Sequence, residues 1–396
     1  MHSPARAGDT AFRVLVALSL SHLLNDVVQA LLPSLYPVLQ ANYRLNFTQI
    51  GLLTLVFQGT ASLLQPLVGM ASDRRPMPAS LAVGMGISLA GVVVLAVARD
   101  FAALLAAAAL VGLGSAIFHP EAARVARFAS GGRHGLAQSF FQVGGNAGTA
   151  LGPLLVVVVV GTRSQLHVLW FSLLALAGIV VLHWVGGWYR AHLATRPAPA
   201  VSAGAGLSRG QVVRSVAVLL ALIFSKFFYL AGMTSFYTFY LMERFGLGIE
   251  AAQIQLFVFL FAVAAGTILG GPLGDRFGRR RIIWASILGA APFTLLLPHA
   301  GLAGCAVLAV GAGLVLSSAF SAILVYAQEL VPGRIGVVSG LFLGFAFGMG
   351  GLGSAALGAL ADRIGIDAVF RLCAYLPLLG LLTMFLPELR RPAAGR

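Results

Sequence analysis

The sequence predicts an all-α membrane protein with twelve transmembrane helices in two pseudo-symmetric six-helix bundles. Three observations support this fold class. Hydrophobic residues make up 59% of the 396 residues and charged residues only 10%, whereas about a quarter of a typical soluble protein is charged. Apolar runs of about 18 or more residues, long enough for a helix to cross a bilayer, recur along the chain. The second half also repeats features of the first, as in membrane proteins built from two related halves.

Twelve apolar runs, bounded by Gly, Pro or charged residues, give the predicted helices. In the first half they cover residues 14–40, 48–71, 79–98, 101–127, 135–160 and 166–189. In the second half they cover residues 213–242, 250–274, 281–298, 302–330, 335–361 and 368–387. The chain therefore divides into an N-terminal bundle (1–190), a cytoplasmic linker (191–212) and a C-terminal bundle (213–396). The linker is less apolar and contains Ala, Pro, Gly and Ser, a composition typical of flexible connections.

The basic residues are distributed unequally between the two sides of the predicted bundle. Of 26 basic residues, 19 fall on one side, six fall in loops on the other side, and Lys226 lies inside a helix. Basic loops are retained in the cytoplasm, so both termini are predicted to be cytoplasmic. Topology thus accounts for the formal net charge of +14, and we expect a lipid bilayer and no nucleic acid as partner.

An acidic residue stands in the middle of the first predicted helix. Asp26 lies about 18 Å beyond Val14 along a helix, near the centre of a hydrocarbon layer about 30 Å thick. An ionised carboxylate there costs roughly 3 kcal/mol or more, so it needs a partner, a cavity or a function. His22 precedes Asp26 by four residues and shares its helical face. Asp26 is the acidic residue, among twelve, that we predict at mid-depth.

These two residues suggest how the protein is energised. A nucleotide-driven protein needs a phosphate-binding loop with a lysine, and the single lysine, Lys226, follows Phe224 and Ser225 in place of glycines. A carboxyl group that alternates between dry and water-filled surroundings can bind and release a proton. We therefore predict Asp26 and His22 as proton-coupling residues, with a proton gradient as the energy source and no cofactor or metal. A fixed ion pair between Asp26 and Lys226 is the structural alternative.

Lys226 is predicted to bind an anionic group of a small molecule. It lies about 18 Å beyond Arg214, at the depth of Asp26 but in the other half. The predicted substrate-binding residues are Lys226 itself, three tyrosines at helical spacing and five polar residues of the first half. The tyrosines are Tyr229, Tyr237 and Tyr240, and the polar residues are His119, Asn25, Gln58, Gln142 and Asn146. Helix packing is the alternative for the tyrosines and amides, and bonding to the carbonyl freed by Pro120 is the alternative for His119.

Charged residues at the cytoplasmic helix ends are predicted to form a gate. Asp275 follows the eighth predicted helix, and Asp73 occupies the equivalent place 202 residues earlier. The predicted gating residues are Asp73, Arg74, Glu121, Arg124, Asp275, Arg276, Arg279, Glu329 and Arg334. Ion pairs between such residues can hold helix ends together. For Glu121 and Arg124, which lie three residues apart, a weak surface pair is the alternative.

Several strings resemble a known family. Residues 271–280, Gly-Pro-Leu-Gly-Asp-Arg-Phe-Gly-Arg-Arg, resemble the signature loop of the major facilitator superfamily. The strings Ser-His-Leu-Leu-Asn-Asp (21–26), Phe-His-Pro-Glu (118–121) and Tyr-Ala-Gln-Glu-Leu-Val-Pro-Gly-Arg (326–334) are similar to those of fosmidomycin resistance proteins, drug efflux members of that superfamily. The resemblance implies the superfamily fold, the bacterial inner membrane, and proton-driven antiport that exports a small anionic phosphonate-type antibiotic. We expect a monomer.

Two other functions stay open at this stage. An uptake carrier that moves a small organic anion together with protons would use the same residues. A receptor or channel without transport activity is the second alternative, although a channel would not need charged loops at the cytoplasmic ends of both halves. An enzyme is not predicted and no catalytic residue is assigned, because the sequence contains no HExxH or GxSxG motif.

Overall fold

The computed structural model describes residues 10–131, 133–161, 163–194, 208–331 and 335–388. Within these ranges the chain is helical and contains no strand. Twelve of its helical stretches are long and apolar enough to cross a membrane. The predicted fold class and the twelve predicted spans are therefore confirmed.

The first half contributes six of these stretches. Their bounds are α1 Phe12–Tyr43, α2 Phe47–Arg74, α3 Ser80–Val97, α4 Phe101–Phe128, α5 His134–Val159, and η1 Gln165–Phe171 continued by α6 Ser172–Ala194. A capping box fixes the start of α2, because the Asn46 side chain accepts a hydrogen bond from the Gln49 amide and the Gln49 side chain accepts one from the Asn46 amide. Helix α6 ends at Ala194, beyond the predicted end of its span at residue 189.

The second half repeats this arrangement with more interruptions. Its bounds are α7 Arg209–Phe245, α8 Ile249–Phe277, α9 Arg279–Gly289, α10 Ala291–Leu296, η2 Leu297–His299, α11 Leu302–Ser317, α12 Ala319–Leu330, α13 Ile335–Ile364, α14 Ile366–Cys373 and η3 Leu376–Phe385. Pro292 follows the break between α9 and α10, consistent with proline at the first turn of a new helix. Helix α7 begins with a capping box of Ser208 and Gln211.

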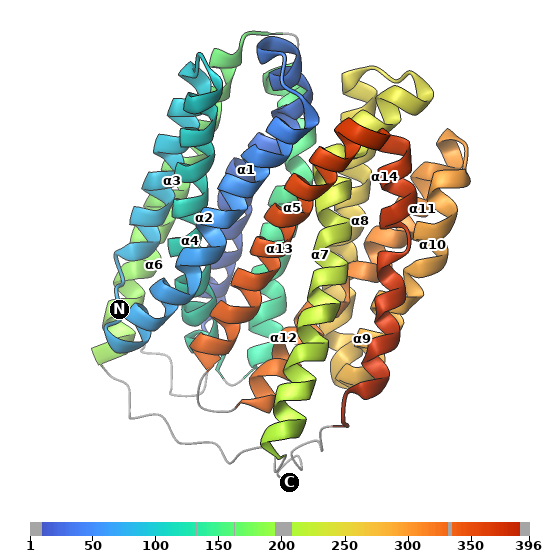
Figure 1. Ribbon diagram of the computed structural model, residues 1–396. Helices are drawn as coiled ribbons and strands as arrows, with labels where there is room; N and C mark the ends of the chain where they lie inside the picture. Colours follow the sequence, from blue (N-terminus) through green and yellow to red (C-terminus); the bar gives the residue numbers. More distant parts are fainter. Residues whose placement is uncertain (1–9, 132, 162, 195–207, 332–334, 389–396) are drawn as a thin grey trace.

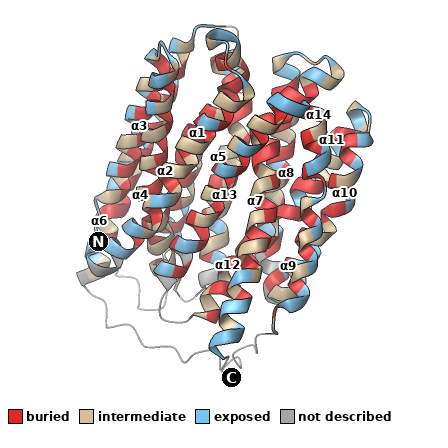
Figure 2. Cartoon of the chain, viewed as in Figure 1, coloured by how far each residue is buried: buried red, intermediate tan, exposed pale blue. Residues whose placement is uncertain are grey.

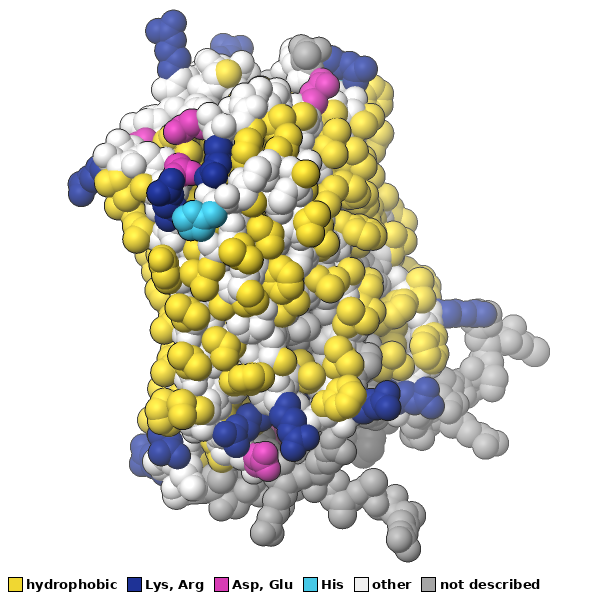
Figure 3. Space-filling view, turned by 90° about the vertical axis from the view of Figure 1, so that its right-hand side faces the viewer, with side chains coloured by type: hydrophobic (Ala, Val, Ile, Leu, Met, Phe, Trp, Pro, Cys, Tyr) yellow, Lys and Arg dark blue, Asp and Glu magenta, His cyan; other side chains and the backbone are white. Residues whose placement is uncertain are grey.

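The helices run side by side along one axis, and α1 begins at the same end of the bundle at which η3 ends (Figure 1). On the face that Figure 3 shows, a broad apolar belt crosses the middle of the molecule, and charged side chains gather above and below it. Buried residues extend along the helices where they face one another (Figure 2). This distribution matches a bundle surrounded by hydrocarbon, with its polar ends in water.

Two helix pairs join the halves: α2 packs against α13, and α5 packs against α8. Helix α13 presents a line of glycines, Gly340, Gly344, Gly348 and Gly351, to α2. Glycines at these intervals share one face of a helix and let two backbones approach closely. The α2–α13 contact is therefore backbone against backbone over much of its length.

A carboxylate also joins the halves at the far end, meaning the end of the bundle opposite the start of α1. Asp362 of α13 accepts hydrogen bonds from the Phe47 amide at 3.1 Å, the Thr48 amide at 2.8 Å and Thr48 Oγ1 at 2.5 Å. These amides belong to the first turn of α2 and have no partner within that helix. A negative charge there is also favourable for the helix dipole. Asp362 thus ties the second half to the start of α2.

We predict that Asp362→Ala loosens the halves at the far end. The change removes acceptors for the first turn of α2 and should cost about 1 kcal/mol, as loss of an N-cap does, which is roughly a fivefold shift in the closed-to-open ratio. The labelling rate of a Ser34→Cys reporter, buried in α1, by a membrane-impermeant maleimide should rise accordingly. Glu250→Ala, which removes an exposed far-end carboxylate in the first turn of α8, is the control. Equal rates in the two variants would contradict the assigned contact.

Candidate functional site

Three titratable side chains meet inside the first half. His22 and Asp26 lie one turn apart near the middle of α1, and His119 reaches them from α4. The His22 Nε2 atom is 3.4 Å from Asp26 Oδ2, and the His119 Nε2 atom is 3.6 Å from Asp26 Oδ1. The two Nε2 atoms are 3.2 Å apart. We call these residues the His22–Asp26–His119 trio.

Backbone carbonyls help to determine where the ring protons lie. His22 Nδ1 is 2.8 Å from the Phe141 carbonyl oxygen, and His119 Nδ1 is 3.0 Å from the Ser115 carbonyl oxygen. A carbonyl oxygen can only accept, so these contacts need a hydrogen on each Nδ1, whereas the Ser115 hydroxyl, 3.1 Å from His119 Nδ1, could instead donate to that nitrogen. In neutral rings with both Nδ1 hydrogens present, the Nε2 lone pairs would point at each other and at the carboxylate. This arrangement is relieved when a cation lies between the three groups, and the smallest such cation is a proton on one Nε2.

The carboxylate has further donors and is partly exposed. Asn25 Nδ2 and Gln29 Nε2 both donate to Asp26 Oδ1 at 3.0 Å. The Asp26 side chain is 15% exposed, whereas that of His22 is 3% exposed. The trio is therefore a largely buried cluster of titratable groups whose carboxylate is its more accessible group. Its three ligand atoms lie within 4.8 Å of one another, so a transition-metal ion could also bind there.

Glycines of α5 allow this site to form. Gly144 and Gly148 face backbone carbonyls of α1, those of Ser19 and Leu23. Gly145, between them in the sequence, faces the trio itself, because a Cβ atom added there would contact His22 and come within 2.8 Å of Asp26 Oδ2. The close approach also stacks the Phe141 ring on His22, with centroids 4.0 Å apart.

Lys226 lies in the second half and is only 3% exposed. Its Nζ atom donates to the Ser317 carbonyl oxygen at 3.4 Å and lies over the rings of Phe227 and Phe320 at 5.5 and 5.3 Å. Among the described residues no carboxylate forms an ion pair with it. The fixed pair between Asp26 and Lys226 is therefore not observed, and an anion brought to Lys226 would not have to displace a carboxylate.

The predicted tyrosines lie in the core of the second half. Tyr229, Tyr237 and Tyr240 are all buried. Tyr240 stacks on Phe370 with centroids 4.3 Å apart, and its hydroxyl oxygen accepts a hydrogen bond from Arg244 at 2.8 Å. The Tyr237 ring also lies 6.2 Å from that of Phe370. These contacts are those of helix packing, and a substrate contact for the tyrosines stays a prediction.

The predicted amides of the first half divide into two groups. Asn25 is fully buried and donates to Asp26, so it supports the trio. Gln58, Gln142 and Asn146 are partly exposed. The Gln58 side chain lies against Gly350 of α13, at the contact between the halves. The partly exposed amides are placed where they could bind a polar solute, and that role is still a prediction.

Of the predicted gating residues, the structure brings Arg279 and Glu329 together in an ion pair within the second half. Glu121 is fully buried, and Arg124 lies over the Phe128 ring at 5.6 Å. Arg276 lies over Phe277 at 5.3 Å. Four predicted gating residues have side chains outside the described part of the chain, and these are Asp73, Arg74, Asp275 and Arg334. A gate across the two halves stays a prediction.

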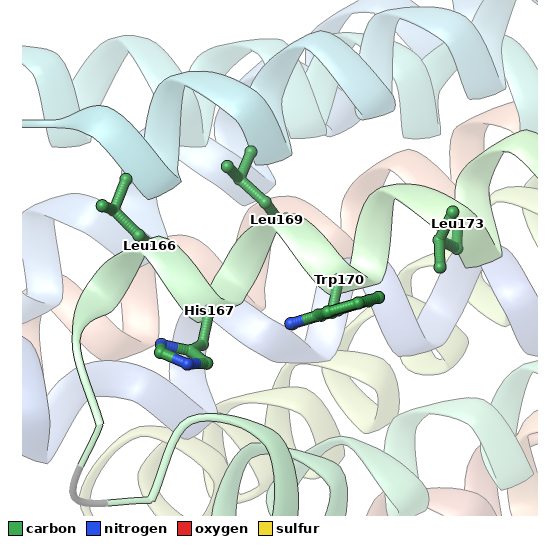
Figure 4. Close-up of a pocket in the computed structure, with 5 residues that line it drawn as sticks. All are labelled: Leu166, His167, Leu169, Trp170 and Leu173. Atoms are coloured by element: carbon green, nitrogen blue, oxygen red, sulfur yellow. The ribbon is translucent and has the colours of Figure 1, made fainter.

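A groove on the outer surface of η1 and α6 is separate from the trio (Figure 4). The residues that line it are Leu166, His167, Leu169, Trp170 and Leu173. Its largest side chain, Trp170, is 62% exposed. Exposed apolar side chains on a membrane-spanning helix contact lipid, so this groove belongs to the lipid-facing surface.

Sequence reasoning missed three residues that shape the site, Phe141, Gly145 and Phe347. The Gly144-Gly145 pair is a visible signal of close helix approach, but the helical face that meets α1 depends on how α5 crosses it. Phe347 of α13 contacts the His119 ring, with centroids 5.5 Å apart. No sequence signal distinguishes Phe347 from the other phenylalanines of α13.

Comparison with known proteins identifies the family. A family profile described as Major Facilitator Superfamily matches residues 18–342 and 240–396, which together span almost the whole chain. The chain belongs to the major facilitator superfamily. Its helical architecture, its twelve membrane-length stretches and its lack of strands in the described ranges agree with this membership.

Two relatives match this superfamily member over nearly its whole length. The fosmidomycin resistance protein of Escherichia coli (strain K12) is 59% identical over 382 residues, which cover 96% of this chain and 94% of that protein. YfnC of Bacillus subtilis (strain 168), an uncharacterized MFS-type transporter, is 42% identical over 391 residues, covering 97% of this chain and 95% of that protein.

Solved structures of other transporters share the fold. A variant of the E. coli fucose:proton symporter FucP has a TM-score of 0.66 at 15% identity and covers 97% of this chain and 100% of its own. A variant of the nucleoside transporter NupG has a TM-score of 0.69 at 13% identity and covers 94% and 99%. This superfamily member is therefore a multi-pass membrane transporter and not an enzyme, as the sequence predicted.

We predict that Gly145→Ala lowers thermal stability more than Gly59→Ala. The new methyl group at residue 145 would press against His22 and Asp26, and overpacking of this kind costs about 1–3 kcal/mol, whereas a Cβ at residue 59 meets open space. Thermal denaturation of the purified proteins in detergent should show a melting temperature several degrees lower for Gly145→Ala. Equal melting temperatures would mean that α5 does not approach the trio as described.

Proposed function

We propose that this transporter is a proton-driven antiporter that exports a small anionic phosphonate-type antibiotic such as fosmidomycin by alternating access. The observation that carries the proposal is the His22–Asp26–His119 trio, whose facing Nε2 atoms favour an added proton. The cargo is suggested by the name of the E. coli relative, which is 59% identical to this chain. Lys226 supports an anionic cargo, because it is buried and has no carboxylate partner among the described residues.

In this proposal the proton and the cargo bind in opposite halves. The trio belongs to α1 and α4, and Lys226 belongs to α7. A proton bound by the trio neutralises the charge of Asp26, and an anion bound at Lys226 neutralises the ammonium. Each binding event removes an uncompensated charge from the membrane interior, where charge is costly. Exchange then follows if the two neutralised states favour opposite orientations of the halves.

The arrangement in the cell follows from the distribution of the arginines. We propose that the protein is a monomer in the bacterial inner membrane with both termini in the cytoplasm. Arginine side chains lie at both edges of the apolar belt in Figure 3, and 19 of the 26 basic residues of the sequence are assigned to the cytoplasmic end. Export would then carry the antibiotic from that end to the far end.

Everted membrane vesicles with an acidic interior test the direction of transport. An antiporter would take added drug into the vesicle and release protons, so a lumenal pH dye would report alkalinisation. A symporter, the alternative, would carry protons inward with the drug and acidify the lumen further. A pH that does not respond to drug would refute proton coupling. Repeating the assay with a metal chelator present separates coupling by protons from coupling by a bound metal ion.

We predict that Asp26→Asn abolishes proton-driven export but keeps drug binding. The amide cannot hold the trio's proton, while Lys226 lies in the other half and is unchanged. Accumulation driven by a pH gradient should fall to the level of vesicles without the protein, and exchange of labelled for unlabelled drug without a gradient should persist. Accumulation that keeps the wild-type response to pH would exclude Asp26 from the mechanism.

We predict that Lys226→Met weakens binding of anionic drug by about 10- to 100-fold, since loss of a charge-assisted interaction costs roughly 1.5–3 kcal/mol. A neutral ester of the same drug should lose little affinity. Lys226→Arg keeps the charge and serves as the matched control. Binding to purified protein is measured for both ligands, and an equal loss for the neutral ester would point to a purely structural role for Lys226.

A further inference from the structure

The walls around the trio come from both halves of the transporter. His22 and Asp26 are held by α1, His119 by α4, and Phe141 and Gly145 of α5 close another side. Helix α13 of the second half contributes Phe347, whose ring lies against His119 with centroids 5.5 Å apart and planes inclined at 62°. Among the described aromatic residues, Phe347 makes the ring contact that reaches the trio from the second half.

Helix α13 also contacts the helix that carries Lys226. A Cβ atom on Gly353 would come within 3.1–3.3 Å of the Phe228 ring and of Ala231, both on α7. Farther along, Gly232 of α7 lies against Leu357 of α13. One helix therefore contacts the proton site through Phe347 and packs against the helix that holds the cargo lysine.

No other titratable group faces the trio from the neighbouring helices in the described part of the chain. Its polar neighbours are the uncharged side chains of Asn25, Gln29 and Ser115, which hydrogen-bond to it. The other rings that contact it are apolar: Phe118 of α4 and Phe141 of α5 lie beside His22, and Phe347 lies beside His119. Protons must therefore reach the trio through water, and an apolar ring that covers an opening excludes water.

We infer that Phe347 is a positioning residue that seals the His119 side of the trio and links its access to water with the position of α13. The inference rests on the proposed function. Phe347 touches neither the proton nor the cargo, and it acts through His119. When α13 moves with the second half, the ring leaves His119 and water can enter. The trio is then open to water on the His119 side at one stage of the cycle and closed on that side at the other.

Proteoliposomes that contain Phe347→Ala test this inference. Without drug, proton leak should rise about tenfold over wild type, because the apolar seal is lost. Drug accumulation driven by a pH gradient should fall by a similar factor, while exchange of labelled for unlabelled drug without a gradient persists. Leu352→Ala, on the same helix but 50% exposed, is the control and should match wild type in all three assays.

Two further variants keep the test decisive if Phe347→Ala does not fold or loses drug exchange. Phe347→Leu keeps an apolar seal and should not leak, whereas Phe347→Tyr keeps the ring but adds a hydroxyl group that can hydrogen-bond water, and should leak. Equal leak in these two variants, or wild-type leak in Phe347→Ala, would overturn the role of Phe347. Failure of wild type to move drug in response to a pH gradient would instead overturn the proposed function, and this role with it.

Discussion

The organisation of the first half depends on one electrostatic requirement. Two imidazole rings, each with its Nδ1 atom against a backbone carbonyl, direct their Nε2 atoms at each other and at a carboxylate. Three electron-rich atoms in a membrane interior repel one another unless a cation joins them. The proposed proton coupling would meet this requirement, and it would give a reason for an acid at mid-membrane.

The helices around the trio are packed so closely that protein groups, and not water, surround it on most sides. Gly144, Gly145 and Gly148 bring α5 against α1, and that approach supplies both the Phe141 carbonyl and the ring stacked on His22. The side chains of Asn25 and Gln29 complete the shell around Asp26. Removing a proton from such a shell leaves a charge with fixed donors, so the deprotonated state is also supported.

The sequence predicted the fold and part of the site for identifiable reasons. Long apolar runs predict helices in a membrane, because lipid cannot satisfy exposed backbone groups. His22 and Asp26 were predicted together because residues four apart share a helical face. The sequence predicts His119 as a substrate-binding residue. Its contact with Asp26 could not be predicted, because that contact depends on how α4 crosses α1. The same limit applies to Phe347, whose partner lies in the other half and far away in sequence.

The glycines of α13 that face α2 have a mechanical consequence. A contact between glycine faces and backbone has few interlocking side chains. It therefore resists sliding less than a contact with knobs-into-holes packing would. A small sliding movement of α2 along α13 would leave the contact area between them almost unchanged. Hydrogen bonds then fasten the contact at two places, from Ser62 to the Gly344 carbonyl and from the first turn of α2 to Asp362. The carboxylate of Asp362 thereby holds one end of a contact between two helices that are each long enough to cross a membrane.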